Sequence, residues 1–118
     1  MYGLPANFQP TIFEGRQLTS VTFAENVIHL NFDEELSVSV LDAVAYRNAS
    51  DNDEMVDAPP LASTSLVSLV GQYVTAGRVE SSRQLLLELE GGGWLRLTDN
   101  SEMYESFIIT IDGKETIV

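Results

Sequence analysis

The stretch Ile-His-Leu-Asn-Phe-Asp-Glu-Glu-Leu-Ser-Val-Ser-Val, residues 28–40, alternates apolar and polar side chains on both sides of an acidic turn. Successive side chains of a β-strand point to opposite faces of the sheet. The pattern therefore predicts two strands, at about 27–32 and 36–42, joined as a hairpin with one apolar face. Residues 85–97, Leu-Leu-Leu-Glu-Leu-Glu-Gly-Gly-Gly-Trp-Leu-Arg-Leu, predict a second hairpin with a glycine turn, because glycine readily adopts the positive φ of tight turns.

The two hairpins match each other along the chain. Gly15 and Gly71 stand 56 residues apart, and Leu18 and Val74 keep that offset. An offset of 57 then pairs the apolar positions of the hairpins and the aspartates that close them: Ile28 with Leu85, Leu30 with Leu87, Phe32 with Leu89, Val38 with Leu95, Val40 with Leu97, and Asp42 with Asp99. A shared glycine, turn and aspartate indicate a duplicated β unit, and the alternative is two unrelated hairpins of similar length.

Further strands are expected outside the hairpins. Strands at about 17–24 and 72–79 precede the two hairpins, and the first half ends in a stub at 44–46. Residues 104–111 carry apolar groups on both faces, which suits a central strand, and Asp112-Gly113 predicts a turn into a last strand. Pro59-Pro60 before 66–70 and Gly71 after it favour one short helix.

These elements predict an all-β fold, or a mainly β fold with one short helix. We expect a single domain over 1–118 in which two similar antiparallel meanders, at about 12–46 and 68–112, pack as a sandwich or a partly open barrel. The acidic stretch 47–60 has little apolar content and is expected to be a mobile linker between them.

The composition excludes several functions. The 118 residues include 18 acidic and 6 basic ones, for a net charge of −12. Nucleic acids and anionic membranes attract basic surfaces, so neither is an expected partner, whereas a basic protein is. The chain has no cysteine, which excludes thiol catalysis, disulfides and cysteine-bound zinc. Without a signal sequence or a long apolar stretch, a cytoplasmic protein is expected.

Catalysis has few candidate residues. His29 is the single histidine, and its position opposite Ile28 and Leu30 predicts a solvated strand residue. Asp42 and Asp99 are expected to end strands and cap turn amides. An alternative function combines one of these aspartates with His29 in a carboxylate-based enzyme acting on a small ligand or a carbohydrate.

Two motifs for bound ligands fail on inspection. A calcium loop starting at Asp51 needs glycine and glutamate at positions held by Val56 and Ala62. The glycine run 91–93 leads into a strand, whereas phosphate-binding loops lead into a helix. We therefore expect no cofactor, no metal and no catalytic residue.

The motif Tyr104-Glu105-Ser106-Phe107, with Leu69-Val70-Gly71-Gln72 upstream, resembles a family of small bacterial all-β domains of unknown function. The resemblance covers mainly 69–118. It implies a small all-β protein without a known catalytic residue. Some relatives in that family are suspected immunity proteins, so the resemblance also implies neutralisation of a toxin.

Charge and resemblance together predict a non-enzymatic, immunity-like protein-binding module. A third reading is a homo-oligomeric structural unit, motivated by the apolar faces of 104–111 and by Leu86 on a polar face. The residues expected to matter in recognition are exposed groups around the two hairpin turns and the acidic linker. The candidate partner-binding residues are Asp33, Glu34, Glu35, Asp51, Asp53, Glu54, Trp94 and Glu105.

Overall fold

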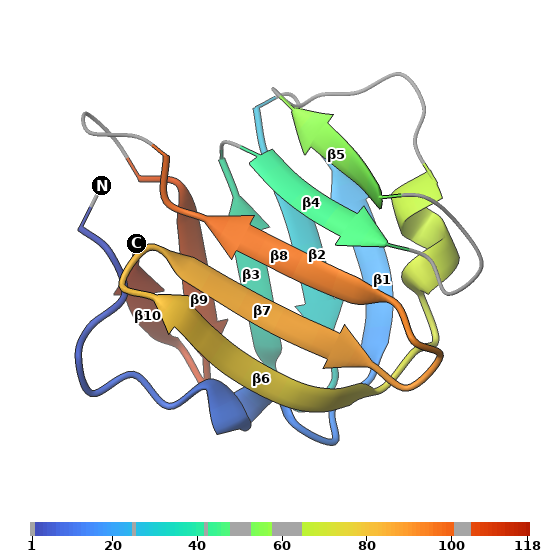
Figure 1. Cartoon of the computed structure of the whole chain (residues 1–118), viewed down its shortest axis with the longest axis horizontal. Helices are drawn as coiled ribbons and strands as arrows, with labels where there is room; N and C mark the ends of the chain where they lie inside the picture. The colour runs from blue at the N-terminus through green and yellow to red at the C-terminus, as the bar shows by residue number, and fades with distance from the viewer. Residues whose placement is uncertain (1, 25, 42, 48–52, 58–64, 101–104) are drawn as a thin grey trace.

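The computed structural model describes residues 2–24, 26–41, 43–47, 53–57, 65–100 and 105–118. Within them, two five-stranded antiparallel sheets face each other and do not close into a barrel, which confirms the predicted all-β class and fits a sandwich (Figure 1). The elements in chain order are η1 (Pro10–Phe13), β1 (Leu18–Phe23), β2 (Ile28–Phe32), β3 (Leu36–Val40), β4 (Ala43–Arg47), β5 (Asp53–Asp57), η2 (Ser65–Leu69), β6 (Val74–Ser81), β7 (Gln84–Leu89), β8 (Trp94–Thr98), β9 (Phe107–Ile111) and β10 (Lys114–Ile117).

In the described residues, both halves of the chain carry the same order of elements, a 3₁₀ helix followed by five strands. Strands β1, β2 and β3 form a meander in the first sheet, and β6, β7 and β8 form one in the second. Each half then sends its last two strands to the other sheet, where β4 pairs with β8 and β9 pairs with β3. The orders β1-β2-β3-β9-β10 and β6-β7-β8-β4-β5 are therefore the same arrangement with the halves exchanged.

The halves meet where a glycine precedes the first strand of each meander. Gly15 donates its N–H to the carbonyl oxygen of Val74 at 2.8 Å, and Gly71 donates to that of Leu18 at 2.7 Å. Both glycines have a positive φ, 81° at Gly15 and 98° at Gly71, which glycine adopts without steric cost. Positions 56 residues apart thus have equivalent backbone conformations and partners.

The matched apolar positions build the core between the sheets. They are all at most 5% exposed: Ile28 and Leu85, Leu30 and Leu87, Phe32 and Leu89, Val38 and Leu95, Val40 and Leu97. The last residues of the two 3₁₀ helices, Phe13 and Leu69, are also buried. Burying one such side chain fully contributes about 1.5–3 kcal/mol, so the matched positions make a large contribution to the packing of the two sheets.

Two segments of the first half differ from the expectations. Residues 44–46, expected as a stub, belong to the complete strand β4. Residues 53–57, expected within a mobile linker over 47–60, form strand β5, which pairs with β4 from Ala43 opposite Asp57 to Arg47 opposite Asp53. Cross-strand pairing supplies the order here, and a local apolar pattern does not predict it.

Strand β9 also differs from its prediction. It begins at Phe107, and only one of its faces enters the core: Phe107 and Ile109 are buried, whereas Ile108 and Thr110 are half-buried on the outside. The sequence predicted a strand with apolar residues packed on both faces. The structure buries only one face, and Ile108 lies half-buried on the outer face of the sheet. Tyr104 lies outside the described residues.

Helical structure in the described residues is limited to 3₁₀ turns. The predicted helix at 66–70 is η2, of five residues, and η1 had no counterpart in the prediction. None of the helices in this part of the chain has the length and apolar character needed to cross a membrane.

The segment before β1 covers the outer edge of β6. The N–H of Gly77 donates to the Glu14 carboxylate at 3.2 Å. A Cβ on Gly77 would collide with the carbonyl oxygen of Pro10, so glycine permits this close approach. An uncovered edge strand offers unpaired backbone groups to other chains, and this contact removes part of that hazard.

Candidate functional site

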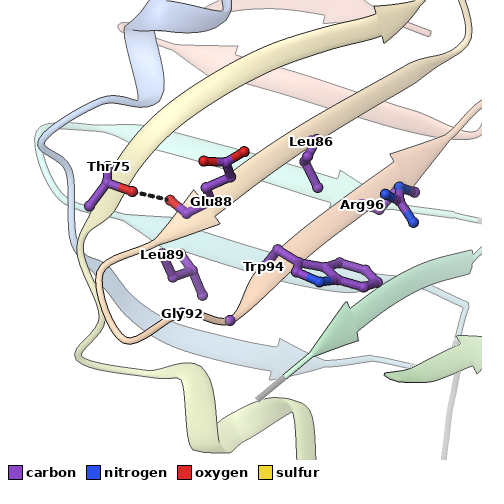
Figure 2. Close-up of a pocket in the computed structure, with 8 residues that line it drawn as sticks. Thr75, Leu86, Glu88, Leu89, Gly92, Trp94 and Arg96 are labelled. Carbon is purple, nitrogen blue, oxygen red and sulfur yellow. Dashed lines mark hydrogen bonds between the residues drawn. The ribbon is translucent and has the colours of Figure 1, made fainter. Parts of the chain in front are cut away.

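A pocket of about 240 Å³ lies on the outer face of the second sheet, beside the turn that joins β7 to β8 (Figure 2). Side chains alternate along β8, so Leu95 and Leu97 enter the core while Trp94 and Arg96 point outward. Strands β6, β7 and β8 and the turn supply the lining residues: Thr75, Leu86, Glu88, Leu89, Gly92, Gly93, Trp94 and Arg96.

The centre of this face is aromatic and apolar. Trp94 is the single tryptophan of the chain and is half-buried. The guanidinium carbon of Arg96 lies 4.6 Å from the centre of the Trp94 ring, a cation–π contact that holds the two side chains together. Leu86 stands in register between Arg78 and Arg96, and it is only 9% exposed although it points outward. Arginine stems cover apolar neighbours in this way, and we attribute the burial of Leu86 to the two arginines that flank it.

Two ion pairs connect the strands across the same face. Arg78 Nε lies 3.1 Å from Glu88 Oε1, and Arg96 Nε lies 3.0 Å from Glu80 Oε1. The four side chains are 33–64% exposed, so each pair contributes only about 0.2–1 kcal/mol to stability. With Arg47 of β4, three of the six basic residues of this acidic chain lie here.

The equivalent positions of the first half carry other chemistry. At the offset of 57, His29, Asn31, Ser37 and Ser39 occupy the places of Leu86, Glu88, Trp94 and Arg96. The Nδ1 of His29 and the Ser39 hydroxyl are 3.0 Å apart, within hydrogen-bond distance, and the Asn31 amide donates to the Ser20 hydroxyl at 2.9 Å. The same backbone arrangement thus supports two different surfaces, so the fold does not require the side chains around Trp94.

Two hairpin turns flank the junction of the halves. Gln17 and Tyr73 form an antiparallel bridge. The N–H of Asp33 donates to the carbonyl oxygen of Gln17 at 3.1 Å, and the N–H of Glu90 donates to that of Tyr73 at 3.0 Å. The turns therefore lie on the two sides of the bridge, with the 43% exposed Tyr73 between them.

The structure brings four of the predicted partner-binding residues to one end of the sandwich. Asp33, Glu34 and Glu35 form the β2–β3 turn, and Trp94 follows the β7–β8 turn. Glu105 lies at the other end of β8, since its neighbour Ser106 bonds to Asp99. Asp51 and the side chains of Asp53 and Glu54 lie outside the described part.

The structure does not assemble the candidate catalytic residues into one site. His29 is half-buried on the outer face of β2 in the first sheet, as its position predicted. Asp99 follows β8 in the second sheet and is 2% exposed. Asp42 lies outside the described residues. Across the described residues, no three side chains of His, Asp or Glu form a group that could hold a metal ion.

Asp99 is buried, and both of its carboxylate oxygens accept hydrogen bonds. The predicted cap of turn amides stays a prediction, because residues 101–104 lie outside the described part of the chain. The Oδ1 of Asp99 accepts a hydrogen bond from the Ser106 hydroxyl at 2.9 Å, and its Oδ2 accepts one from the N–H of Gly3 at 2.9 Å. Burial raises the pKa of Asp99, but the hydrogen bonds that its carboxylate accepts, those from Ser106 and Gly3 among them, hold the pKa below its ordinary value of 3.8. Asp99 is therefore a structural carboxylate that fastens the start of the chain to the end of β8.

Sequence reasoning selected Trp94 but missed Arg78, Glu88 and Arg96. These residues surround the pocket only when β6, β7 and β8 are paired in one register, and the sequence did not provide that register. The matched halves contained one signal for this site. The outward positions of β8 are Trp94 and Arg96, whereas the first half has serines at the matching positions.

Comparison of the chain with protein families, with curated proteins and with solved structures finds no match. The resemblance of 69–118 to small bacterial all-β domains therefore stays a prediction. The functional argument rests on the geometry of the outer face and on the charge of the chain.

Proposed function

We propose that this chain is a non-enzymatic module that binds a basic protein through the Trp94 face, which we define as Arg78, Leu86, Glu88, Trp94 and Arg96. The observation that carries the proposal is the half-buried Trp94 ring, stacked with Arg96 beside a pocket. The equivalent strand of the other half has serines at both positions, so the core does not explain this pair. Tryptophan and arginine are the residue types most enriched among binding hot spots.

The charge of the chain favours a basic partner. A net charge of −12 attracts basic proteins over a distance and repels acidic ones. The Trp94 face has internal ion pairs, so the long-range attraction comes from the surrounding surface. The exposed side chains of Glu34, Glu35 and Glu90, on the turns at the same end, supply part of it.

A site-specific photocross-link tests the proposal. Benzoylphenylalanine replaces Tyr73, which is 43% exposed and two residues before Thr75 of the pocket. The control carries it at Tyr2, which is 65% exposed and next to the Gly3–Asp99 contact at the other end of β8. In the source cells, we expect the Tyr73 probe to join a basic protein that the Tyr2 probe does not reach.

The captured protein is then purified and titrated with the intact chain. We expect Trp94→Ala to weaken binding by tenfold or more, on the order of a hot-spot loss of 2 kcal/mol, and added salt to slow association. Unchanged affinity of Trp94→Ala would overturn the proposal. Cross-links only to a second copy would favour the homo-oligomeric reading instead.

An immunity-like role is the form of this proposal in which the basic partner is a toxin. We expect the encounter to be cytoplasmic, in line with the cysteine-free sequence. Co-expression of the chain with the captured partner should then restore growth, and the Trp94→Ala variant should not. A partner that is harmless when expressed alone would contradict this form and leave the binding proposal standing.

A further inference from the structure

We infer that the pocket of the Trp94 face receives one long cationic side chain, an arginine or a lysine, of the partner. This inference rests on the proposed function and specifies what its site recognises. The pocket volume of about 240 Å³ is below the range of about 300–1,000 Å³ typical of drug-sized ligands and cofactors. One amino-acid side chain or one sugar ring is the size of group that fits.

The walls suit an apolar stem. Leu86 of β7 and the Trp94 ring contribute aliphatic and aromatic surface. Leu89 also borders the pocket, but its side chain is 4% exposed and packs in the core. Gly92 and Gly93 have no side chain, so the backbone of the turn forms one side of the pocket. Arginine and lysine bury their methylene stems on such surface while the charged end stays near polar groups.

The polar groups suit a positive end. The Glu88 carboxylate lines the pocket, and its partner Arg78 is 64% exposed, so this ion pair is weak and exchanges at little cost. The other charged lining residue, Arg96, already contacts Trp94 and pairs with Glu80 at 3.0 Å. A cation entering the pocket therefore competes with Arg78 for the Glu88 carboxylate, beside an Arg96 whose charge Glu80 offsets. Arg47, opposite Trp94, adds a positive charge to the same face, so the attraction has to come from Glu88 and from the acidic surface around the face.

The aromatic ring adds to the same preference. The Trp94 ring attracts cations and already carries the Arg96 guanidinium at 4.6 Å, so an incoming cation has to share the ring with Arg96 or displace it. A neutral sugar could also stack on Trp94, but it would gain nothing from the net charge of −12. A cationic side chain uses the ring, the carboxylate and the charge together.

The test uses blocked tripeptides, because the partner is not needed to probe one side chain. Acetyl-Gly-Arg-Gly-amide and its lysine counterpart are compared with the norleucine peptide, which has a similar stem without charge, and with methyl glucoside. Trp94 is the single tryptophan, so its fluorescence reports the pocket directly. Amide NMR shifts locate each bound probe.

We expect the arginine and lysine peptides to change Trp94 fluorescence with millimolar affinity and to shift the amides of Leu86, Glu88 and Gly92. Glu88→Gln should weaken this binding about fivefold, or about 1 kcal/mol, and high salt should weaken it too. The matched control is Glu115→Gln, which removes the same charge from an exposed position on β10. It should leave the affinity unchanged.

Three outcomes would overturn the inference. Equal binding of the norleucine peptide would make the pocket simply apolar, and binding of the glucoside in preference to the arginine peptide would make it a sugar site. Shifts spread over the acidic turns, with no change at Glu88→Gln, would reduce the effect to general electrostatics. If the cross-linked partner still needs Trp94 but binds Glu88→Gln with full affinity, the proposed function stands and only the cationic side chain is refuted.

Discussion

Leu30 and Leu87 occupy equivalent, fully buried positions, whereas the residues that precede them lie on outer faces of different chemistry. His29 belongs to a surface of hydroxyl and amide groups, and Leu86 to one of arginines, a tryptophan and carboxylates. Inward positions of the repeat are held by packing against the opposite sheet. Outward positions are free of that constraint, so a difference between them is where a difference in function can reside.

We expect the largest effect from substitutions in the core, which test whether the buried positions of the two halves are equivalent. Leu30→Ala and Leu87→Ala each remove a fully buried side chain, which costs about 2–5 kcal/mol of unfolding free energy. If both halves belong to one cooperative core, the two losses should agree within about 2 kcal/mol, the spread that different Leu→Ala cavities produce. Urea denaturation followed by circular dichroism measures both. A loss in only one variant, or a second transition, would break the comparison.

The next prediction concerns Asp99 of the second half, whose carboxylate joins the end of β8 to Ser106 and to Gly3. Asp99→Asn replaces the acceptor of the Ser106 and Gly3 bonds and should cost about 1–3 kcal/mol at neutral pH. The folded-state pKa of Asp99 is below 3.8, so its contribution is complete above that pH and is lost as the pH falls through the lowered pKa. Urea titrations of both proteins from neutral to acidic pH should therefore converge.

A gap between wild type and Asp99→Asn that stayed constant down to the most acidic pH would contradict this explanation. Glu115→Gln serves again as the control, because an exposed carboxyl should change stability by less than about 0.5 kcal/mol.

The smallest effect concerns one matched position of the two turns, where different residues share a positive φ. Glu35 has a φ of 60° in the first turn, and Gly92 has a φ of 93° in the second. Glu35→Gly should stabilise the chain by about 0.5–1 kcal/mol by relieving the left-handed conformation, and Gly92→Ala should destabilise it by about 1 kcal/mol. A Cβ on Gly92 meets no atom within 4 Å, so the change isolates backbone strain. Thermal unfolding measures both, and shifts of the same sign would refute the explanation.

The hairpins and the matched core positions could be predicted because their signals are local. The alternation over 28–40 and 85–97 assigns faces one residue at a time, and the glycines at 15 and 71 need only their own conformation. The acidic segment 53–57 could not be predicted as a strand, because its order comes from pairing with β4. The exchange of β4–β5 and β9–β10 between sheets likewise depends on contacts far apart in the chain.

The candidate site divides in the same way. Trp94 was predicted as an exposed group beside the glycine turn, and the acidic turns stood out by composition. Arg78 and Glu88 could be recognised as neighbours only from the register of β6 against β7. A single sequence gives the direction of a side chain well and its cross-strand neighbour poorly, since a one-residue slip moves every neighbour.

Because each half completes the sheet of the other, a chain of half this length could reach the same architecture only as a pair of copies. Such a pair would fall apart on dilution, since its assembly is bimolecular. When both halves belong to one chain, each half experiences the other at a fixed effective concentration. For halves joined by a short linker this concentration is on the order of millimolar. A single chain that holds both halves thus folds independently of protein concentration, and its two outer faces, which would be identical in a symmetric pair, can differ.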